Sequence, residues 1–438
     1  MRRDLNLYWW GQTTSAFGSI FTAVALPVVA VVQLGASPGQ MGLIAAASTL
    51  PGIIMGLPAG ALADRIRHPR RVLLTLDTIA ALGVGVLALG LSYHVASISW
   101  LVCLGVIEGC LSILEGCLYF VHLRQLVDAD AIGPVRARLQ AGQYGAALLG
   151  RILAGPVIVA FGSPAALATD AVSYVLSATA LLTMRVSDRV PLRSDQGEAG
   201  TFRGAVSGLR FFAGHPFHRA LLVFIVVPVA ALTGLTTLVG PFLLRVIRLP
   251  TAYYGLAFVL SGVMGLAGSA VAGRVLGPHS DPRRITILAF SGGTVCSLLL
   301  PMATGPLPLA VGCAALGIGL PIFFGAIANV ALTSFFAADV AEGAMGRVTA
   351  ALQVITACSA LLGSLAAGAL GDQLGVRPAL WTLCAVALTA AAMAGPQALR
   401  AARRLRDADH TAVTTPTVPS EQAVQPLHDP VPAPQHRR

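Results

Sequence analysis

Long apolar stretches, separated by short polar or arginine-rich segments, recur along the whole chain. A helix that crosses a membrane needs about 20 consecutive apolar residues. Only helices and closed barrels satisfy their backbone polar groups inside lipid, and runs this long and continuous predict helices. We therefore expect twelve membrane-spanning helices, at 8–33, 40–62, 72–93, 98–121, 141–161, 164–184, 217–244, 252–276, 285–304, 307–335, 348–370 and 375–396.

The longest polar interruption falls halfway along the chain, at 185–216. It divides a first set of six predicted helices, in 1–184, from a second set of six in 217–396. Within this linker, residues 201–212 mix arginines with aromatic side chains, which predicts a helix lying in the membrane interface. The last segment, 397–438, is rich in Pro, Thr and Gln, so we expect a disordered cytoplasmic tail.

The composition agrees with a membrane protein. Of 438 residues, 55% are hydrophobic and only 11% are charged, whereas soluble domains carry roughly 25% charged residues. A soluble core of this size would need a polar shell that this sequence does not supply. The fold class that we expect is an all-α integral membrane protein, which excludes a secreted domain, a cytosolic enzyme and a nucleic-acid binder.

All 29 basic residues are arginine. If the N-terminus lies in the cytoplasm, 25 of the 29 fall on the cytoplasmic side, and this bias predicts that both termini are cytoplasmic. The same bias explains the net charge of +10 without a nucleic-acid partner. A chain without lysine has no phosphate-binding Walker loop. The seven cysteines lie in apolar runs without the spacing of a metal site, so we expect no metal and no cofactor.

The loop between the second and third predicted helices carries the most specific motif. It reads Gly60-Ala61-Leu62-Ala63-Asp64-Arg65-Ile66-Arg67-His68-Pro69-Arg70-Arg71. A glycine, an Asp-Arg pair four residues later and two closing basic residues resemble the signature loop of the major facilitator superfamily of transporters. The resemblance implies a gating loop made of Gly60, Asp64, Arg65, Arg70 and Arg71, in which the carboxylate meets the positive end of a neighbouring helix. The alternative is an ordinary arginine-rich cytoplasmic loop.

Other fragments are similar to the branch of that family that holds enterobactin exporters and macrolide-efflux proteins. The resemblance implies two six-helix halves around a central cavity that helices 1, 4, 7 and 10 line. One departure concerns the fourth helix, where proton-coupled members often carry an arginine four residues before a glycine and this chain has Gly105 before Gly109. The matching fragments are Gly11-Gln12 with Ser15 and Gly18, Asp170 with Ser173-Tyr174, Gly208-Leu209-Arg210-Phe211 with His215-Pro216, Asn329, and Gly346-Arg347-Val348.

The fourth predicted helix carries a polar stripe. Glu108, Ser112, Glu115 and Tyr119 follow one another at i, i+4, i+7 and i+11, and this spacing places them on one helix face. A carboxylate inside lipid is costly and therefore a functional candidate. The stripe either faces the cavity, as the resemblance implies, or its glutamates pair inside the bundle for structural reasons.

Polar residues on three other predicted helices are weaker candidates for the wall of a substrate cavity. Hydroxyl and amide groups also hold membrane helices together, so packing and ligand contact are equally good interpretations. These candidates are Gln12, Ser15, Ser19, Thr233, Thr236 and Asn329.

The intramembrane charges suggest an ion pair and a proton site. Glu108 and Arg151 lie at the same depth if consecutive antiparallel helices are neighbours, so we expect them to pair. Glu115 is then left to bind either a proton or a cationic substrate, which would couple the two fluxes. Asp77 is the rival proton site and Asp170 a more distant one.

We therefore expect a secondary active transporter, acting as a monomer in the bacterial inner membrane. It would export a drug-like or siderophore-like small molecule by alternating access, driven by protons. The alternatives are a nutrient-uptake symporter of the same fold and a transport-dead scaffold or sensor. An enzyme is not expected, because no catalytic constellation such as His-Glu-x-x-His is present.

Overall fold

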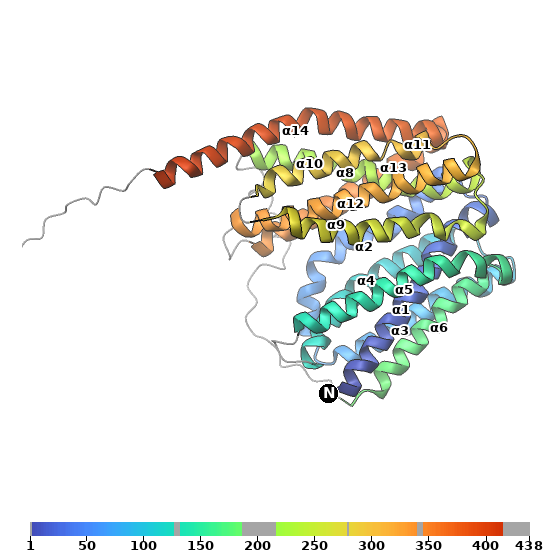
Figure 1. Ribbon diagram of the computed structural model, residues 1–438. Helices are drawn as coiled ribbons and strands as arrows, with labels where there is room; N and C mark the ends of the chain where they lie inside the picture. The colour runs from blue at the N-terminus through green and yellow to red at the C-terminus, as the bar shows by residue number, and fades with distance from the viewer. Residues whose placement is uncertain (1, 127–131, 186–215, 278–279, 340–344, 415–438) are drawn as a thin grey trace, which may run out of the picture.

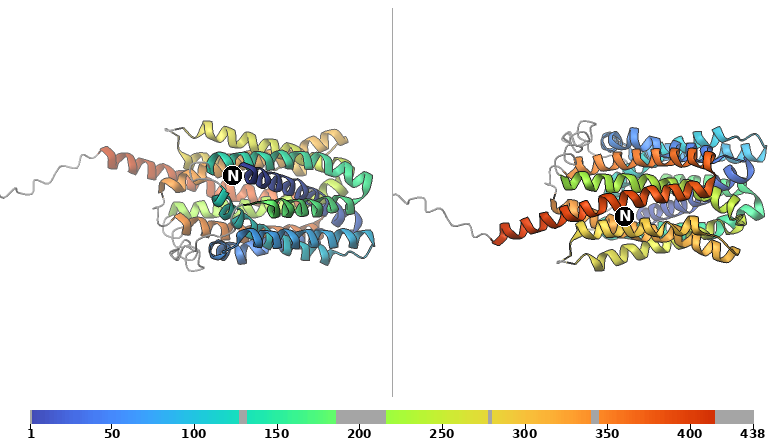
Figure 2. Two further views of the ribbon diagram at one scale, coloured as in Figure 1. Left: turned by 90° about the horizontal axis from the view of Figure 1, so that it is seen from below. Right: turned by 90° about the horizontal axis from the view of Figure 1, so that it is seen from above.

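The computed structural model describes residues 2–126, 132–185, 216–277, 280–339 and 345–414. Within these ranges every regular element is a helix, and the helices run roughly parallel in one elongated bundle (Figures 1 and 2). The N-terminal half lies on one side of the bundle and the C-terminal half on the other (Figure 1). The predicted linker helix at 201–212 lies outside the described residues.

The N-terminal half contains six long helices and one π-helical turn. Prolines at the first residue of two helices are tolerated because that position has no intrahelical N–H partner. The elements are α1 (Arg2–Val28), η1 (Val29–Gln33), α2 (Pro38–Arg65), α3 (Pro69–Ser92), α4 (Ile98–Leu126), α5 (Ile132–Phe161) and α6 (Ser163–Thr183).

The C-terminal half has more broken helices. Its first helix ends in a π-helical turn, as α1 does, and its second begins with two 3₁₀ turns. The elements are α8 (Pro216–Pro241), η4 (Phe242–Val246), η5 (Thr251–Tyr253), η6 (Gly255–Phe258), α9 (Val259–Val275), α10 (Pro282–Cys296), α11 (Leu299–Met302), α12 (Leu307–Asp339), α13 (Met345–Leu374) and α14 (Val376–Thr414).

Twelve helices in the described part of the chain are long and apolar enough to cross a membrane. Each coincides with a span predicted from the sequence, and the ends differ by a few residues. Large apolar side chains such as Leu82, Val159 and Leu362 are exposed on the outside of the bundle, as suits contact with lipid rather than water. The all-helical fold class with twelve membrane-capable helices is confirmed.

The two halves repeat one packing pattern. In the first half, α1 packs against α5 and α6, α2 against α4, and α3 against α4 and α6. In the second half, α8 packs against α13 and α14, α9 against α12, and α10 against α12 and α14. The chain is therefore built from two structurally equivalent units of six spans, as internal repeats in transporters are.

Two regions make most of the contacts between the halves. α2 packs along α13, where Gly42 and Gly368 let the two backbones approach closely. α5 packs against η5, η6 and the start of α9. Small residues at such interfaces are typical of helix association in membranes.

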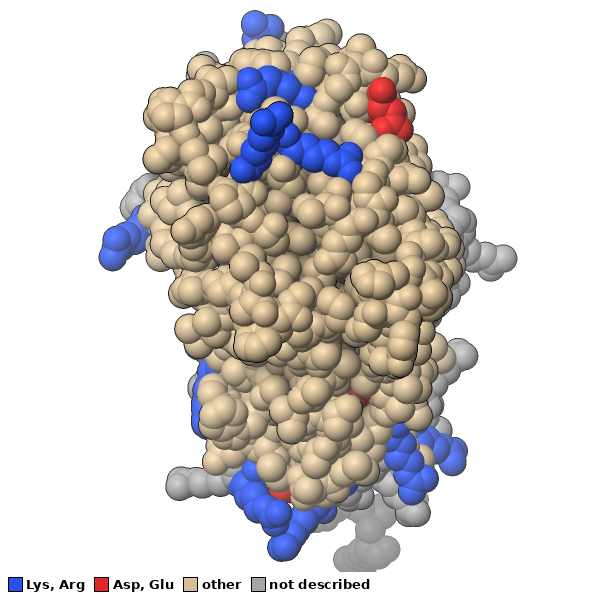
Figure 3. All heavy atoms as spheres, turned by 90° about the vertical axis from the view of Figure 1, so that its right-hand side faces the viewer, with Lys and Arg blue, Asp and Glu red and all other residues tan. Residues whose placement is uncertain are grey.

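The two ends of the bundle differ in charge. The chain begins at the end that carries Arg3, Arg67, Arg138 and Arg283, which we call the arginine-rich end. Figure 3 views the opposite end, where a few arginines and one acidic side chain lie near the upper edge. The middle of this face is largely uncharged, and further charged side chains appear along its left and lower edges.

The last helix is longer than predicted. α14 continues to Thr414, beyond the predicted end of the span at 396, and projects from the arginine-rich end of the bundle (Figure 1). The segment 397–414 is rich in Ala, Leu and Arg, which favour helices, and no proline interrupts it before Pro416. The prediction of a disordered tail from residue 397 is therefore wrong for residues 397–414, which are helical. Residues 415–438 lie outside the described part of the chain.

Candidate functional site

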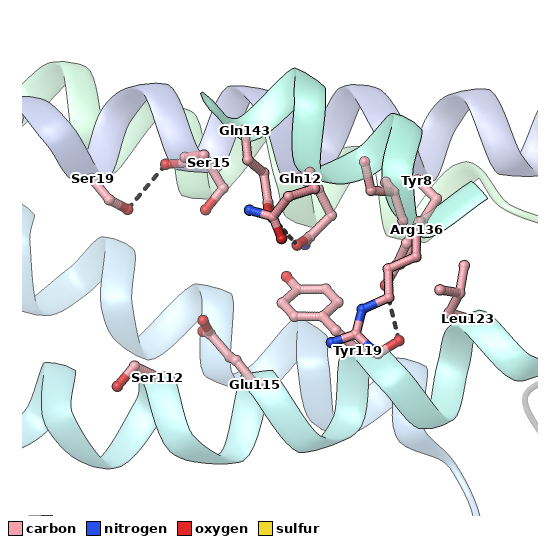
Figure 4. A pocket seen from close by; sticks show the side chains of 14 residues that line it. Tyr8, Gln12, Ser15, Ser19, Ser112, Glu115, Tyr119, Leu123, Arg136 and Gln143 are labelled. Carbon is pink, nitrogen blue, oxygen red and sulfur yellow. Dashed lines mark hydrogen bonds between the residues drawn. The ribbon is translucent and has the colours of Figure 1, made fainter. Parts of the chain in front are cut away.

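A cavity of about 350 Å³ lies in the N-terminal half, between α1, α4 and α5. Polar side chains form most of its wall, and Figure 4 shows the Glu115 side chain pointing from α4 into the space between α1 and α4. Volumes of this order are typical of small-molecule sites. The wall consists of Tyr8, Gln12, Ser15, Ala16, Ser19, Ser112, Glu115, Gly116, Tyr119, Leu123, Arg136, Leu139, Gln140 and Gln143.

Most of the residues that the sequence nominated on the first and fourth spans do line this cavity: Gln12, Ser15, Ser19, Ser112, Glu115 and Tyr119. Glu108 and the candidates from the C-terminal half do not line the cavity. Thr236 and Asn329 are exposed and Thr233 is half-buried, on helices of the other half. The helical spacing of the polar residues therefore identified the wall on α1 and α4, whereas Thr233, Thr236 and Asn329 lie elsewhere.

The sequence interpretation missed the contribution of α5. Arg136, Gln140 and Gln143 line the cavity from this helix, and Gln143 donates from Nε2 to Gln12 Oε1 at 3.4 Å. The apolar run predicts a span that begins at 141, but the helix begins at Ile132, so Arg136 and Gln140 lie in a helix and not in the loop before the predicted span. Their i, i+4, i+7 spacing was the signal that could have found them.

Glu115 is the acidic residue of the cavity wall. Its side chain is half-buried, and its Oε1 atom has no hydrogen-bond partner among the described residues. The neighbouring charged groups are themselves acidic: Asp77, Glu108 and Asp170 act electrostatically on it. A carboxylate in this position is available to a proton or to a cationic group of a ligand.

Asp77 lies directly behind the cavity wall. It is 1% exposed, and Tyr119, which lines the cavity, donates its hydroxyl to Asp77 Oδ1 at 3.5 Å. The Tyr8 hydroxyl donates to the Tyr119 carbonyl oxygen at 2.9 Å. The side chain of Tyr119 thus separates a fully buried carboxyl from the cavity.

Glu108 and Asp170 belong to a second polar cluster, deeper in the half. The Tyr174 hydroxyl donates to Glu108 Oε2 at 3.3 Å and lies 3.4 Å from Ser19 Oγ. Asp170 accepts hydrogen bonds from Thr22 and, at 3.2 Å, from Ser173. Among the residues that the structure describes, hydroxyl groups rather than cations therefore hold both carboxyls.

The predicted ion pair between Glu108 and Arg151 does not form. The Arg151 guanidinium instead donates to the Phe258 carbonyl oxygen at 3.2 Å, across the interface between the halves. The prediction assumed that consecutive helices are neighbours, but α4 packs against α2 and α3, whereas α5 packs against α1 and the C-terminal half. Equal depth in the bundle does not bring the two side chains together.

Side chains at or toward the opposite end of the bundle hold the halves together through backbone groups. Arg245 donates from Nη2 to the Val31 carbonyl oxygen at 2.8 Å. Asp372 on α13 accepts from the Gly39 N–H at 3.0 Å and the Ser37 hydroxyl at 3.3 Å. Since α2 begins at Pro38, Asp372 caps a helix of the other half.

The predicted gating loop is described only in part. Gly60, Asp64 and Arg65 lie in the last turn and a half of α2, and their side chains are outside the described residues. Arg70, at the start of α3, donates from Nη2 to the Leu182 carbonyl oxygen at 2.6 Å, near the end of α6. Arg71 lies beside it in the same first turn. The role of these residues in gating stays a prediction.

Comparison with known proteins identifies the class to which this fold and cavity belong. Residues 8–353 match the model of the Major Facilitator Superfamily. The chain is a member of this superfamily, a multi-pass membrane protein of a transporter family.

Two bacterial relatives extend over most of the chain. The uncharacterized MFS-type transporter YfiS of Bacillus subtilis (strain 168) is 28% identical over 389 residues, which cover 83% of this chain and 86% of the relative. The multidrug efflux pump Tap of Mycolicibacterium fortuitum is 26% identical over 386 residues, or 86% of this chain and 91% of Tap.

Solved structures show the same fold at lower identity. The nucleoside transporter NupG has a TM-score of 0.69 and 15% identity, over 92% of this chain and 98% of its own. A bacterial homologue of the iron transporter ferroportin, in an inward-facing state, has a TM-score of 0.68 and 15% identity, over 92% of this chain and 99% of its own. At this identity the likeness concerns the fold.

Proposed function

We propose that this protein is a proton-coupled exporter of a drug-like or siderophore-like small molecule, working by alternating access. The observation that carries the proposal is the Glu115 carboxylate, which faces the cavity with one oxygen atom unpartnered among the described residues. Such a group binds either a proton or a cationic substrate group. Competition between the two on one site couples their movements in opposite directions.

The contacts between the halves support an inward-facing state. The bonds of Arg245 and Asp372 lie at the end opposite the start of α1 and the end of α14, and Arg151 bonds across the interface further in. The cavity lies on the other side of them, toward the arginine-rich end, which the arginine bias assigns to the cytoplasm. Rocking of the halves around the cavity would break these bonds and open the opposite end.

Two carboxyls are candidates for the coupling proton. We assign it to Glu115, because this side chain lines the cavity and substrate reaches it directly. Asp77 is the second candidate, since Tyr119 connects it to the same cavity. In this assignment a proton reaches Asp77 only by way of the Tyr119 hydroxyl, and Asp77 is a secondary proton site.

Export and location rest on the relatives and the sequence motifs. Tap is described as a multidrug efflux pump, and the fragments that resemble enterobactin and macrolide exporters point the same way. With both bacterial relatives, this supports an exporter in a bacterial inner membrane. That the exporter is a monomer is part of the proposal, and the arginine bias supports cytoplasmic termini.

Transport by the purified full chain in proteoliposomes tests the proposal. We expect an acidic vesicle interior to drive accumulation of a labelled compound from a panel of cationic and zwitterionic drug-like molecules. Accumulation driven by an acidic exterior would instead indicate a nutrient-uptake symporter. Absence of any proton-linked movement across the panel would contradict transport and favour a scaffold or sensor.

A further inference from the structure

Most residues of the cavity wall form hydrogen bonds. Nine of the fourteen carry a hydroxyl, an amide or a carboxylate group. Aromatic side chains in this wall are limited to Tyr8 and Tyr119, and large aliphatic ones to Leu123 and Leu139. A lipophilic compound in this cavity would therefore meet little apolar surface and many hydrogen-bonding groups.

These polar groups lie inside the membrane-spanning segments. A polar group that loses its water without gaining another partner costs free energy. If alternating access encloses the cavity during the cycle, the bound substrate has to supply the partners that water supplies in the open state. The nine residues are Tyr8, Gln12, Ser15, Ser19, Ser112, Glu115, Tyr119, Gln140 and Gln143, all within helices long and apolar enough to cross a membrane.

Three amides in the wall offer donors and acceptors together. Gln143 donates from Nε2 to Gln12 Oε1 at 3.4 Å. This bond uses only one group of each side chain, so the Gln12 NH₂ group and the Gln143 carbonyl oxygen can bond to a ligand. Gln140 adds a third amide from α5. Since a hydroxyl group also donates and accepts, ligand hydroxyls match this part of the wall.

Glu115 supplies the negative charge of the wall, deep in the cavity. At ~1.5 Å per residue it lies about 16 Å from the end of α4 at Leu126. Arg136 also lines the cavity, but it lies only about 6 Å from the start of α5 at Ile132. Both of these helix ends are at the arginine-rich end, so a cation on Glu115 binds further in than the Arg136 guanidinium (Figure 4).

The corresponding helices of the other half add no charge. In the described helices α8 and α12, residues 222–244 and 307–335 contain no acidic or basic side chain. Recognition of a cationic group in this cavity therefore falls to Glu115.

We propose that the substrate is a polyhydroxylated amine, whose ammonium group binds Glu115 and whose hydroxyl groups bind the amides of the wall. This inference rests on the proposed transport function for its biological meaning, and it narrows the drug-like substrates to hydrophilic ones. The cavity of about 350 Å³ has room for one sugar-sized ring with its substituents. An amine without hydroxyl groups would leave the amides unpaired, and such a site discriminates strongly against it.

Calorimetric titration of the full chain in detergent, with three matched six-membered rings, tests the substrate class. The probes are glucosamine, cyclohexylamine, which lacks the hydroxyl groups, and glucose, which lacks the ammonium group; empty micelles are titrated in parallel. We expect glucosamine to bind about tenfold or more tightly than either of the others, because each lacks one kind of partner that the wall requires. Glucosamine that binds no more tightly than cyclohexylamine or than glucose, absence of binding included, overturns the proposal.

Variants then assign the two kinds of contact. Glu115→Gln should reduce the affinity for glucosamine to that for glucose. Gln140→Leu should weaken glucosamine binding several-fold without weakening cyclohexylamine, because it removes only an amide. Gln397→Leu is the matched control, since Gln397 is exposed on α14 and does not line the cavity. Equal effects of Gln140→Leu and Gln397→Leu on glucosamine would contradict the assignment.

The binding test and the transport test fail separately. Preference for cyclohexylamine, with proton-driven transport of other panel compounds intact, would contradict the polyhydroxylated substrate and leave the proposed function standing. Preference for glucosamine without any proton-driven transport would contradict the proposed function alone.

Discussion

At the scale of single residues, three carboxyls inside the bundle of the N-terminal half accept hydrogen bonds from hydroxyl groups. Tyr119 donates to Asp77, Tyr174 to Glu108 and Thr22 to Asp170. A fixed ion pair would be costly to break, because removing one charge leaves the other buried and unpaired. A carboxyl that is bonded to a hydroxyl leaves no unpaired charge behind when it becomes neutral, so it can gain and lose a proton during a transport cycle.

Removal of the Tyr174 hydroxyl should destabilise the protein. Tyr174→Phe leaves Glu108 Oε2 without its donor, while Oε1 already has no partner among the described residues. An unsatisfied buried polar group costs about 1–3 kcal/mol, so we expect a lower Tm in detergent. The control is Tyr253→Phe, whose side chain is exposed, and this variant should melt like the wild type. A Tyr174→Phe variant as stable as the control would contradict the role of this bond.

Helical spacing predicts residues on one helix better than contacts between helices. Six of the ten residues nominated for the cavity line it, because their spacing on α1 and α4 fixes a common face. The Glu108–Arg151 pair failed because depth along a helix says nothing about which helix is its neighbour. The bonds of Tyr174 to Glu108 and of Asp372 to Gly39 join segments that are distant in sequence. No local sequence pattern predicts such bonds.

At the scale of elements, α5 packs against η5 of the other half, and in the inward-facing state that we propose this contact closes the opposite end of the bundle. A Cβ atom added at Gly155 would lie 2.8 Å from the Ala252 carbonyl carbon. Overpacking of this kind costs about 1–3 kcal/mol, so Gly155→Ala should favour the state in which these helices separate. Gly145 on the same helix faces open space, and Gly145→Ala is therefore the matched control.

Spin-label distances between the two halves measure this separation. Phe161 on α5 and Met302 on α11 are exposed near the opposite end, and each is replaced by cysteine in a background without native cysteines. We expect Gly155→Ala to increase the population with the longer distance, and Gly145→Ala to match the parent. Identical distance distributions for both variants would show that the α5–η5 contact does not control closure.

The cap that Asp372 provides to α2 should have a similar effect on closure. Loss of an N-cap costs about 1 kcal/mol, or roughly fivefold in an equilibrium constant. Asp372→Ala should therefore shift the same distance distribution toward separation. Asp281→Ala is the control, because Asp281 caps α10 within one half, through the N–H groups of Arg283 and Arg284. A shift of equal size in both variants would contradict a specific role for the cap between halves.

Most elements were predictable because apolar length alone defines a membrane helix. The exceptions lie where polar residues continue a helix past the membrane. α5 begins at Ile132 rather than 141, and α14 extends to Thr414 rather than 396. Hydropathy marks where the apolar run ends, whereas helix propensity and the absence of proline decide where the helix ends.

At the scale of the whole molecule, the two halves share a packing pattern but not a charge pattern. The buried carboxyls Asp77 and Asp170, the half-buried Glu108 and the cavity carboxylate Glu115 all lie in the N-terminal half. The C-terminal half contributes the Phe258 carbonyl oxygen, the Arg245 guanidinium and the Asp372 carboxylate to the bonds between the halves. We infer that the first half binds proton and substrate, while the second moves against it.

From the sequence, the arrangement of the halves could be predicted only to the level of the fold class. The long polar interruption at 185–216 and the motif from Gly60 to Arg71 indicated two six-helix halves of the major facilitator type. Which end is closed depends on bonds such as that of Arg245 to Val31, which join residues of different halves. These bonds follow from the conformation that the chain adopts, and a sequence shared by all conformations of the cycle does not specify one of them.

Proton-driven transport by the Glu115→Gln variant in proteoliposomes tests most directly whether Glu115 couples proton and substrate. The amide can neither release a proton nor pair with a cationic group, so the variant should bind substrate more weakly. At saturating substrate it should still exchange substrate down its own gradient, but it should not accumulate substrate in response to an acidic vesicle interior. Asp77→Asn, measured in parallel, should retain pH-driven accumulation. Wild-type accumulation by Glu115→Gln, together with its loss in Asp77→Asn, would contradict the assignment and place the coupling proton on Asp77.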